Sequence, residues 1–173
     1  MRVREATVDD SAAIAEIQVN SYRSAYSDLL PDEYLSAFST EEQTQDWKEL
    51  LQEQRDLVLV AENADGLLVG YALTRKLDED GQEPPPCELV ALHVRREWHR
   101  QGAGRALVSA VAQRMHALGC PSLTLWVMEG NPAVQFYERL GGKLCGEKYF
   151  EIDDQKLRRK ELGYCWEKIE DLF

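Results

Sequence analysis

The sequence predicts a mixed α/β (α+β) fold, with a mostly antiparallel sheet of about six to seven strands flanked by about four helices. Three observations support this prediction. The middle of the chain has the order strand, glycine-rich turn, helix, strand and helix. One hairpin of strands is expected before this unit, and another is expected after it. A crossover helix combined with two hairpins gives a sheet with parallel and antiparallel pairs.

Alternation and helical periodicity divide the first part of the chain into a strand, two helices and an aromatic-rich connection. An aspartate at the start of the first apolar periodic segment is placed to cap that helix. The expected elements are a strand over 2–6, a helix that begins at Asp9 or Asp10, an aromatic-rich stretch over 20–38 interrupted by Pro31, and a helix over about 41–54.

A turn between two apolar runs predicts the first hairpin. Residues 57–62 and 67–74 are the two runs, and Asn63-Ala64-Asp65-Gly66 separates them. The acidic segment DEDGQEPPP, residues 78–86, is expected to be a surface loop. The strongly apolar sequence ELVALHV, residues 88–94, predicts the next strand.

The second half combines a long helix, a strand, a short helix and a final hairpin. Leu107, Val111 and Met115 have helical spacing, and Gly119 follows where a helix usually ends. The expected elements are a helix over about 104–118, a strand over 123–128, a short helix that ends at Gly141-Gly142, and two strands around Asp153-Asp154.

The composition limits the classes of partner and of compartment. The 173 residues include 20 Lys and Arg against 31 Asp and Glu, a formal net charge of −11. This balance argues against nucleic-acid binding, which depends on basic residues that neutralise phosphates. No apolar run approaches the roughly 20 residues needed to cross a bilayer, and no secretory signal is visible. We therefore expect a cytoplasmic protein that binds neither nucleic acid nor membrane.

The cysteines and histidines do not predict a metal site. No CxxC pair occurs, and no histidine stands at zinc-site spacing from a cysteine. We expect His93 to pack at a strand end and His116 to lie on a solvated helix face. The thiols are expected to be reduced, and they are Cys87, Cys120, Cys145 and Cys165.

The sequence WHRQGAGRAL, residues 98–107, is a basic, glycine-rich corner in this acidic chain. It lies at a predicted strand-to-helix turn, where unpaired N–H groups and the helix dipole favour an anion. Gly102 and Gly104 let the backbone turn tightly and approach a ligand. Arg100 and Arg105 add positive charge at the rim. We expect a small anionic ligand here, and a solvated charged loop is the alternative.

Two common phosphate-binding motifs fit this corner poorly. The dinucleotide motif GxGxxG needs a third glycine, and Leu107 stands at that position. The P-loop ending Gly-Lys-Ser/Thr is absent. A nucleotide-binding regulator therefore remains a weaker interpretation.

The corner resembles the acetyl-CoA corner of the GCN5-related N-acetyltransferases (GNAT), whose signature is Arg or Gln, two residues, Gly, one residue, then Gly or Ala. Here the pattern falls on residues 99–104, with His99 in place of the usual first residue. ELVALHV is similar to the family's fourth strand, and WVMEGNPAVQFYERLGG is similar to its fifth strand and following helix. The resemblance spans nearly the whole chain and implies a single N-acetyltransferase domain over 1–173.

The resemblance implies an acetyl-CoA site made largely by main-chain groups. The corner would hold the pyrophosphate, and the end of the fourth strand would hold the pantetheine arm. The residues expected to contact acetyl-CoA are Leu92, His93, Val94, Arg100, Gln101, Gly102, Ala103, Gly104, Arg105 and Asn131. Asn131 precedes Tyr137 by one residue fewer than the family's usual interval, and an ordinary turn residue before Pro132 is its alternative interpretation.

Tyr137 and Glu88 are the candidate catalytic residues. Tyr137 stands where the family often has a phenol near the CoA sulfur, and a phenol with a pKa near 10 can donate a proton at neutral pH. Its alternative is packing on the apolar face of its helix. Glu88 stands where some members deprotonate the amine through water, and its alternative is the polar end of a strand. An unperturbed glutamate would accept a proton from an alkyl ammonium at a cost of about 8 kcal/mol.

The resemblance also implies an amine acceptor lying over the sheet, framed by the first helices and the last hairpin. The residues expected to line this site are Tyr22, Tyr26, Leu30 and Tyr34. The acceptor would be a primary amine of a small molecule or peptide, and the acidic charge would favour a cationic one. The alternative function is an acyl-CoA-binding or regulatory module without turnover. The resemblance is also compatible with a homodimer.

Overall fold

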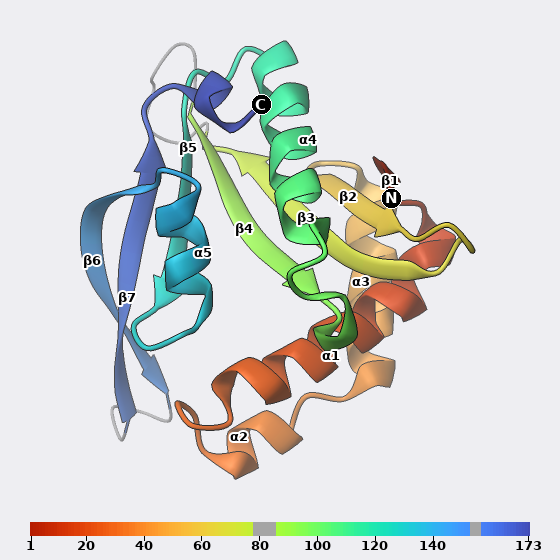
Figure 1. Ribbon diagram of the computed structural model, residues 1–173. Coiled ribbons are helices and arrows are strands. Elements are labelled where there is room, and N and C mark those ends of the chain that lie inside the picture. Colours follow the sequence, from red (N-terminus) through yellow and green to blue (C-terminus); the bar gives the residue numbers. More distant parts are fainter. Residues whose placement is uncertain (78–85, 153–156) are drawn as a thin grey trace.

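The computed structural model describes residues 1–77, 86–152 and 157–173 and contains one seven-stranded sheet (Figure 1). The strand order is β1-β2-β3-β4-β5-β7-β6, and only the β4–β5 pair is parallel. The mixed, mostly antiparallel sheet is therefore confirmed. The strands are β1 (Arg2–Glu5), β2 (Leu57–Glu62), β3 (Leu68–Lys76), β4 (Cys87–Val94), β5 (Leu123–Met128), β6 (Lys143–Ile152) and β7 (Leu157–Trp166).

Five α-helices occur in the described residues, one more than the sequence predicted. The additional helix is α2, which begins directly after Pro31, whose extended backbone separates it from α1. The aromatic-rich stretch is therefore largely helical, because α1 continues into it. The helices are α1 (Ser11–Tyr26), α2 (Asp32–Ser36), α3 (Thr40–Glu53), α4 (Ala103–Ala117) and α5 (Ala133–Arg139).

Asp10 occupies the N-cap position of α1, but its side chain does not cap the helix. Its carboxylate accepts a hydrogen bond from the main-chain N–H of Thr7 at 2.7 Å. It also accepts from Arg4 at 2.7 Å. The predicted N-cap position is therefore confirmed, but the Asp10 side chain makes no capping bond to α1 and instead joins β1 to the turn before it. Arg4 also pairs with Glu62 of β2, at 2.7 Å.

The helices cover the sheet unequally. On one face, α4 and α5 bury the core residues Leu107, Val111, Leu123, Leu125 and Trp166. On the other face, α1 and α3 cover β2 and β3, and this second core contains Ile14, Ile17, Trp47, Val60 and Tyr71. The outer strands β5, β7 and β6 extend beyond that second layer (Figure 1).

The two predicted hairpins are present, as β2–β3 and β6–β7. The first has the Asn63–Gly66 turn, in which the side chain of Asn63 accepts hydrogen bonds from two main-chain N–H groups. The turn expected at Asp153-Asp154 and most of the loop expected over 78–86 lie outside the described residues.

β4 contains an irregularity and then separates from β5. Leu73 of β3 pairs with Ala91 and Thr74 pairs with Leu89, so Val90 is an extra residue in β4. Such a bulge changes which side chains face each layer. The ladder to β5 includes only two pairs among the described residues, at Cys87 and Glu88. Beyond them the two strands diverge (Figure 1).

Candidate active site

The glycine-rich corner folds into the N-terminus of α4. Gly102 has φ of +87°, a left-handed conformation that favours glycine, and its carbonyl accepts from Ala106 at 2.9 Å in the first helical turn. A Cβ at Gly104 would lie 3.3 Å from Cζ of Phe136 on α5. The second glycine therefore brings α4 close to α5. The first N–H groups of α4 have no helical acceptor and are oriented for an anion.

Two side chains of the corner contact main-chain carbonyls just before it. A ring nitrogen of His99 lies 2.9 Å from the carbonyl of Val94, and the Gln101 amide donates to the carbonyl of Glu97 at 2.8 Å. Any contact of Gln101 with a ligand would therefore use its main chain. Arg100 and Arg105 are exposed at the rim, as their expected role requires.

The side chain of Arg95, just before the corner, makes its polar contacts within the fold. Its guanidinium donates to the carbonyl of Leu68 at 2.9 Å and pairs with Glu16 at 2.8 Å. The side chain is only 15% exposed. Arg95, which precedes the corner, therefore adds little positive charge to its rim.

The end of β4 lies beside the corner. One of its edges pairs with β3, and the other faces the space where β4 and β5 separate, which is called the opening below. Leu92 and Val94 pair with Ala72 and Gly70 of β3. Their side chains pack against the α4 core. On the other edge the ladder has already ended at Glu88. Beyond that point this edge has no ladder pair with β5 among the described residues, and the carbonyl of Val94 meets the ring of His99.

His93 turns toward the opposite layer, because the bulge at Val90 reverses the facing of the strand end. Its ring centroid lies 5.4 Å from that of Tyr71 and 6.2 Å from that of Tyr22. Burial lowers the pKa of His93 to about 4. The imidazole is therefore neutral at physiological pH, consistent with the expectation of a packed residue.

Tyr137 lies on α5 and is 7% exposed. Its ring packs near Phe136 and Trp166, at centroid distances of 5.3 and 6.5 Å. Burial raises the pKa of the phenol well above its usual value, and the charge of Tyr26 adds to this effect. Tyr137 thus stays protonated at neutral pH. Packing and proton donation, the two interpretations of this residue, are compatible.

Asn131 connects α5 to α1. Its Oδ1 accepts from the N–H of Ala133 at 2.8 Å, and its side chain also hydrogen-bonds Tyr26. These contacts fit the interpretation of Asn131 as a turn residue. They leave the side chain engaged with the protein, so a contact with CoA stays a prediction.

Glu88 lies at the closed end of the opening. It pairs with Arg75 of β3 and with Thr124 of β5, and its side chain is partly buried. Its neighbours Cys87 and Leu89 face the α4 core, so Glu88 faces the other side of the sheet. This is the side on which the expected acceptor residues lie.

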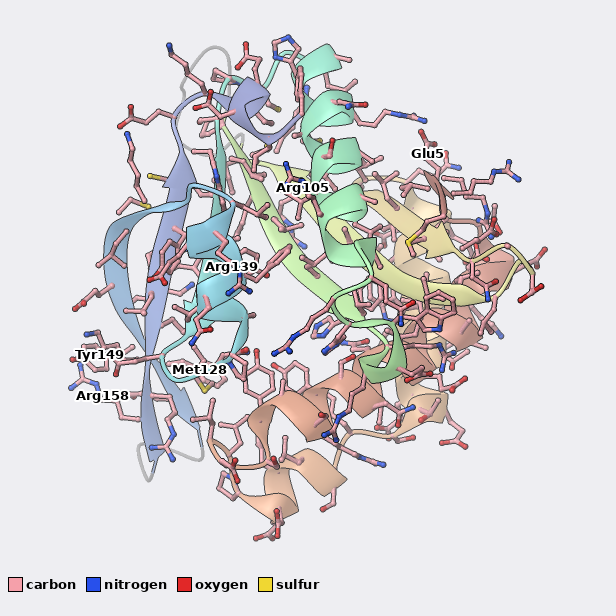
Figure 2. All side chains as sticks on the ribbon, viewed as in Figure 1. Glu5, Arg105, Met128, Arg139, Tyr149 and Arg158 are labelled. Atoms are coloured by element: carbon pink, nitrogen blue, oxygen red, sulfur yellow. The ribbon has the colours of Figure 1, made fainter. Side chains whose placement is uncertain are left out.

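The expected acceptor residues lie together. The rings of Tyr22 and Tyr26 are 4.6 Å apart, and those residues pack with Tyr34 around buried Leu30, Leu35 and Met128. Met128 ends β5, and its side chain points toward α1 and α2 (Figure 2). This aromatic group therefore borders the wide end of the opening.

Two residues that the sequence did not indicate belong to the same region. Burial raises the pKa of both Tyr22 and Tyr26, and the negative charge of Glu161 on β7 adds a smaller effect in the same direction. Trp126 lies on β5 between Thr124 and Met128, facing away from the α4 core. The only signal in the sequence was alternation in β5, and it does not reveal which strand lies beside it.

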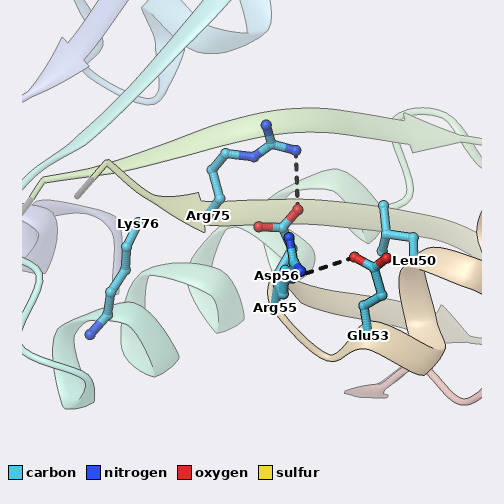
Figure 3. A pocket seen from close by; sticks show the side chains of 6 residues that line it. All are labelled: Leu50, Glu53, Arg55, Asp56, Arg75 and Lys76. Atoms are coloured by element: carbon cyan, nitrogen blue, oxygen red, sulfur yellow. Dashed lines mark hydrogen bonds and ion pairs between the residues drawn. The ribbon is translucent and has the colours of Figure 1, made fainter. Parts of the chain in front are cut away.

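Two hollows are also present in the described residues, and one of them shares Arg105 with the corner. One of about 310 Å³ includes Arg105 and Arg139, whose side chains lie between α4 and α5 (Figure 2). The other, of about 570 Å³, lies between the end of α3 and β3 (Figure 3). Four of its charges are paired, because Arg75 contacts Asp56 at 3.1 Å and Arg55 contacts Glu53 at 3.5 Å, and Lys76 donates to the carbonyl of Leu118.

Within the described ranges, no three His, Cys, Asp or Glu side chains are grouped to hold a metal ion. In the same part of the chain, every helix is too short or too polar to traverse a bilayer.

Comparison with known proteins agrees with this geometry. The model of the acetyltransferase (GNAT) family matches residues 19–142. The uncharacterized N-acetyltransferase YuaI of Bacillus subtilis (strain 168) is 34% identical over 172 residues, which are 98% of this chain and 95% of YuaI.

Solved structures share the fold. PaiA N-acetyltransferase from Thermoplasma acidophilum, in complex with coenzyme A, superposes with a TM-score of 0.71 at 19% identity, over 94% of this chain and 96% of PaiA. YncA from Salmonella typhimurium, with its cofactor acetyl-CoA, superposes with a TM-score of 0.72 at 21% identity, over 98% of this chain and 94% of YncA.

Proposed function

Because this chain belongs to the GNAT family of acetyltransferases, we propose that it transfers the acetyl group of acetyl-CoA to a primary amine of a small molecule or peptide. The observation that carries the proposal is the opening between β4 and β5, bordered by the N-terminus of α4. The opening connects the corner, where an anion can bind, to the edge of β4 that has no strand partner among the described residues. An elongated cofactor with a pyrophosphate requires both features.

Acetyl-CoA would follow the opening from the corner to the aromatic group. Its pyrophosphate would accept hydrogen bonds from the first N–H groups of α4, between Gly102 and Arg105. Arg100 would add positive charge at the rim. The pantetheine arm would bind the free edge of β4 near Leu92 and Val94. The thioester would then lie near Tyr137.

Transfer would occur by direct attack in a ternary complex. The neutral amine attacks the thioester carbonyl, the tetrahedral intermediate collapses, and the C–S bond breaks. Tyr137 would give its proton to the departing thiolate. Glu88 would receive the proton of the amine through water, because it faces the side on which the acceptor residues lie. Tyr22, Tyr26, Leu30 and Tyr34 would contact the body of the acceptor.

Binding of acyl-CoA without turnover is the second candidate. Such a module would not need a protonated, buried phenol beside the opening. Tyr137, a buried phenol whose pKa is raised by burial so that it keeps its proton at neutral pH, is the residue that favours the enzyme.

The first experiment is isothermal titration with acetyl-CoA, using NAD as a control ligand. Gly102→Trp should abolish micromolar binding, because the indole would fill the approach to the α4 N-terminus. Gly66→Trp is the matched control: Gly66 also has a positive φ, +80°, and open space around it, but it lies in the β2–β3 turn. It should bind like the wild type. A folded protein that binds no acetyl-CoA would refute the proposal.

A further inference from the structure

The outer half of the sheet presents polar and aromatic side chains opposite α4 and α5. Leu125 and Val127 of β5 and Tyr164 of β7 face the α4–α5 core. Alternation therefore directs Trp126 and Glu161 to the opposite face. Met128, which pairs with Glu161 across the strands, meets α1 and α2 there. This face is continuous with the aromatic group at the opening.

Trp126 is seated on two glycines of the neighbouring strands. A Cβ at Gly163 of β7 would lie 2.9 Å from Cζ3 of the indole, and one at Gly146 of β6 would lie 3.3 Å from Cη2. Any larger residue would push the ring away. The glycines thus keep the indole flat over the sheet, with its other ring face turned outward.

The ammonium of Lys148 occupies that outward ring face. Its Nζ lies 4.3 Å from the ring centroid of Trp126 and 3.4 Å from a carboxylate oxygen of Glu161. An indole face and a carboxylate are the two groups that recognise an alkyl ammonium. The Lys148 side chain is 48% exposed, and a pair exposed to this degree is held weakly. Another ammonium can replace it without changing the charge of the site.

We infer that Trp126 and Glu161 form a subsite for a second ammonium group of the acceptor, which displaces Lys148. The acceptor class is a diamine or another molecule with two primary amines. The inference rests on the proposed function, because it assumes that the acceptor lies on this face. Met128, which pairs with Glu161, packs with Tyr22 and Tyr26, so the subsite lies beside the expected acceptor residues.

The subsite suits an anchoring amine and not the attacking amine. The attacking nitrogen must lose its proton before it reacts. An aromatic face and a carboxylate both stabilise the protonated form, so they would raise the pKa of an amine held there. The reacting amine must therefore lie elsewhere, toward Glu88 and the thioester. Thr124, which pairs with Glu88, is two residues from Trp126, or about 7 Å along β5.

The test is isothermal titration of the protein, supplemented with CoA, with 1,5-diaminopentane and with n-pentylamine. The two amines share a chain length, and only the first carries a second ammonium. We expect the diamine to bind about tenfold more tightly. No acetyl transfer is needed, so the titration can be interpreted even if the proposed activity fails. Acetyl-CoA binding and the Gly102→Trp variant test that activity separately.

Three variants locate the effect. Trp126→Leu and the nearly isosteric Glu161→Gln should each weaken diamine binding about fivefold and leave n-pentylamine unchanged. Lys148→Met should strengthen diamine binding two- to fivefold, because it removes the internal competitor. The matched controls are Lys160→Met and Glu147→Gln, which disrupt a similar pair, 2.8 Å apart, in the same hairpin. They should have no effect.

Equal affinity for the two amines, or no binding of either, would overturn the inference. So would unchanged diamine binding in Lys148→Met, because the lysine would then not compete. If Glu147→Gln weakens diamine binding as much as Glu161→Gln does, or Lys160→Met strengthens it as much as Lys148→Met does, the effect is the general charge of the hairpin, and the subsite is refuted.

Discussion

Tyr26 on α1 and Tyr137 on α5 belong to helices on opposite faces of the sheet, and Asn131 links these helices: its Oδ1 accepts from the N–H of Ala133 in α5, and its side chain interacts with Tyr26. Burial raises the pKa of Tyr137, and a charge on Tyr26 would raise it further. Among the described residues the ladder between β4 and β5 ends at Glu88, so paired strands no longer separate the two layers beyond that point. The proposed proton donor and the proposed acceptor residues come from these two layers.

Replacing Tyr137 by Phe should lower kcat about 100-fold and leave the dissociation constant of acetyl-CoA nearly unchanged. The variant removes the proton donor for the thiolate and keeps the ring that packs near Phe136 and Trp166. Steady-state thiol release and calorimetry would measure the two quantities. If Tyr137→Phe has the kcat of the wild type, Tyr137 does not donate the proton, and only its packing role remains.

Glu88→Gln should lower kcat about tenfold or more at neutral pH, because the carboxylate would no longer receive the amine proton. The defect in kcat/KM should shrink as the pH rises, since more of the free amine is then neutral. A pH profile of kcat/KM for Glu88→Gln and for the control Glu97→Gln would show this. A constant ratio to wild type across the profile would argue against the base.

His93 should make the folded state less stable in mild acid. Its pKa in the folded protein is about 4, below the unfolded value of about 6.5. The unfolded chain therefore binds the proton first, and the stabilisation present above pH 6.5 is lost as the pH falls toward 4. In urea titrations, the stability difference between wild type and His93→Gln should change between pH 7.5 and 5.

Asp10→Asn should lower the free energy of unfolding by about 1–3 kcal/mol, because Arg4 and the N–H of Thr7 would lose a charged acceptor. The Arg4 guanidinium lowers the pKa of this carboxyl. Its stabilisation is therefore present above the unfolded pKa and is lost as the pH falls through the folded one. Urea unfolding at pH 7 measures the cost. Glu53→Gln, which removes an exposed pair at 3.5 Å, should change it by less than about 0.5 kcal/mol.

The sequence predicted most elements because local periodicity and glycine positions determine them. The corner at Gly102 could be found for the same reason. Features that depend on how distant strands align could not be found. The bulge at Val90 appears only when β4 is paired with β3. Likewise, Trp126 meets Gly163 through the β5–β7 register, and no local pattern encodes that register.

The short ladder between β4 and β5 has a consequence for how the sheet holds together. The sheet has one half made of strands β1, β2, β3 and β4 and another made of β5, β7 and β6. Two residue pairs of the β4–β5 ladder join these halves among the described residues. A cofactor bonded to the free edge of β4 would serve as a narrow extra strand. Amide hydrogens on that edge should then exchange rapidly in the free protein and slowly with CoA, while the midpoint of thermal unfolding rises with CoA concentration. Bound CoA would thus connect the two halves of the sheet, and they would unfold in a single transition.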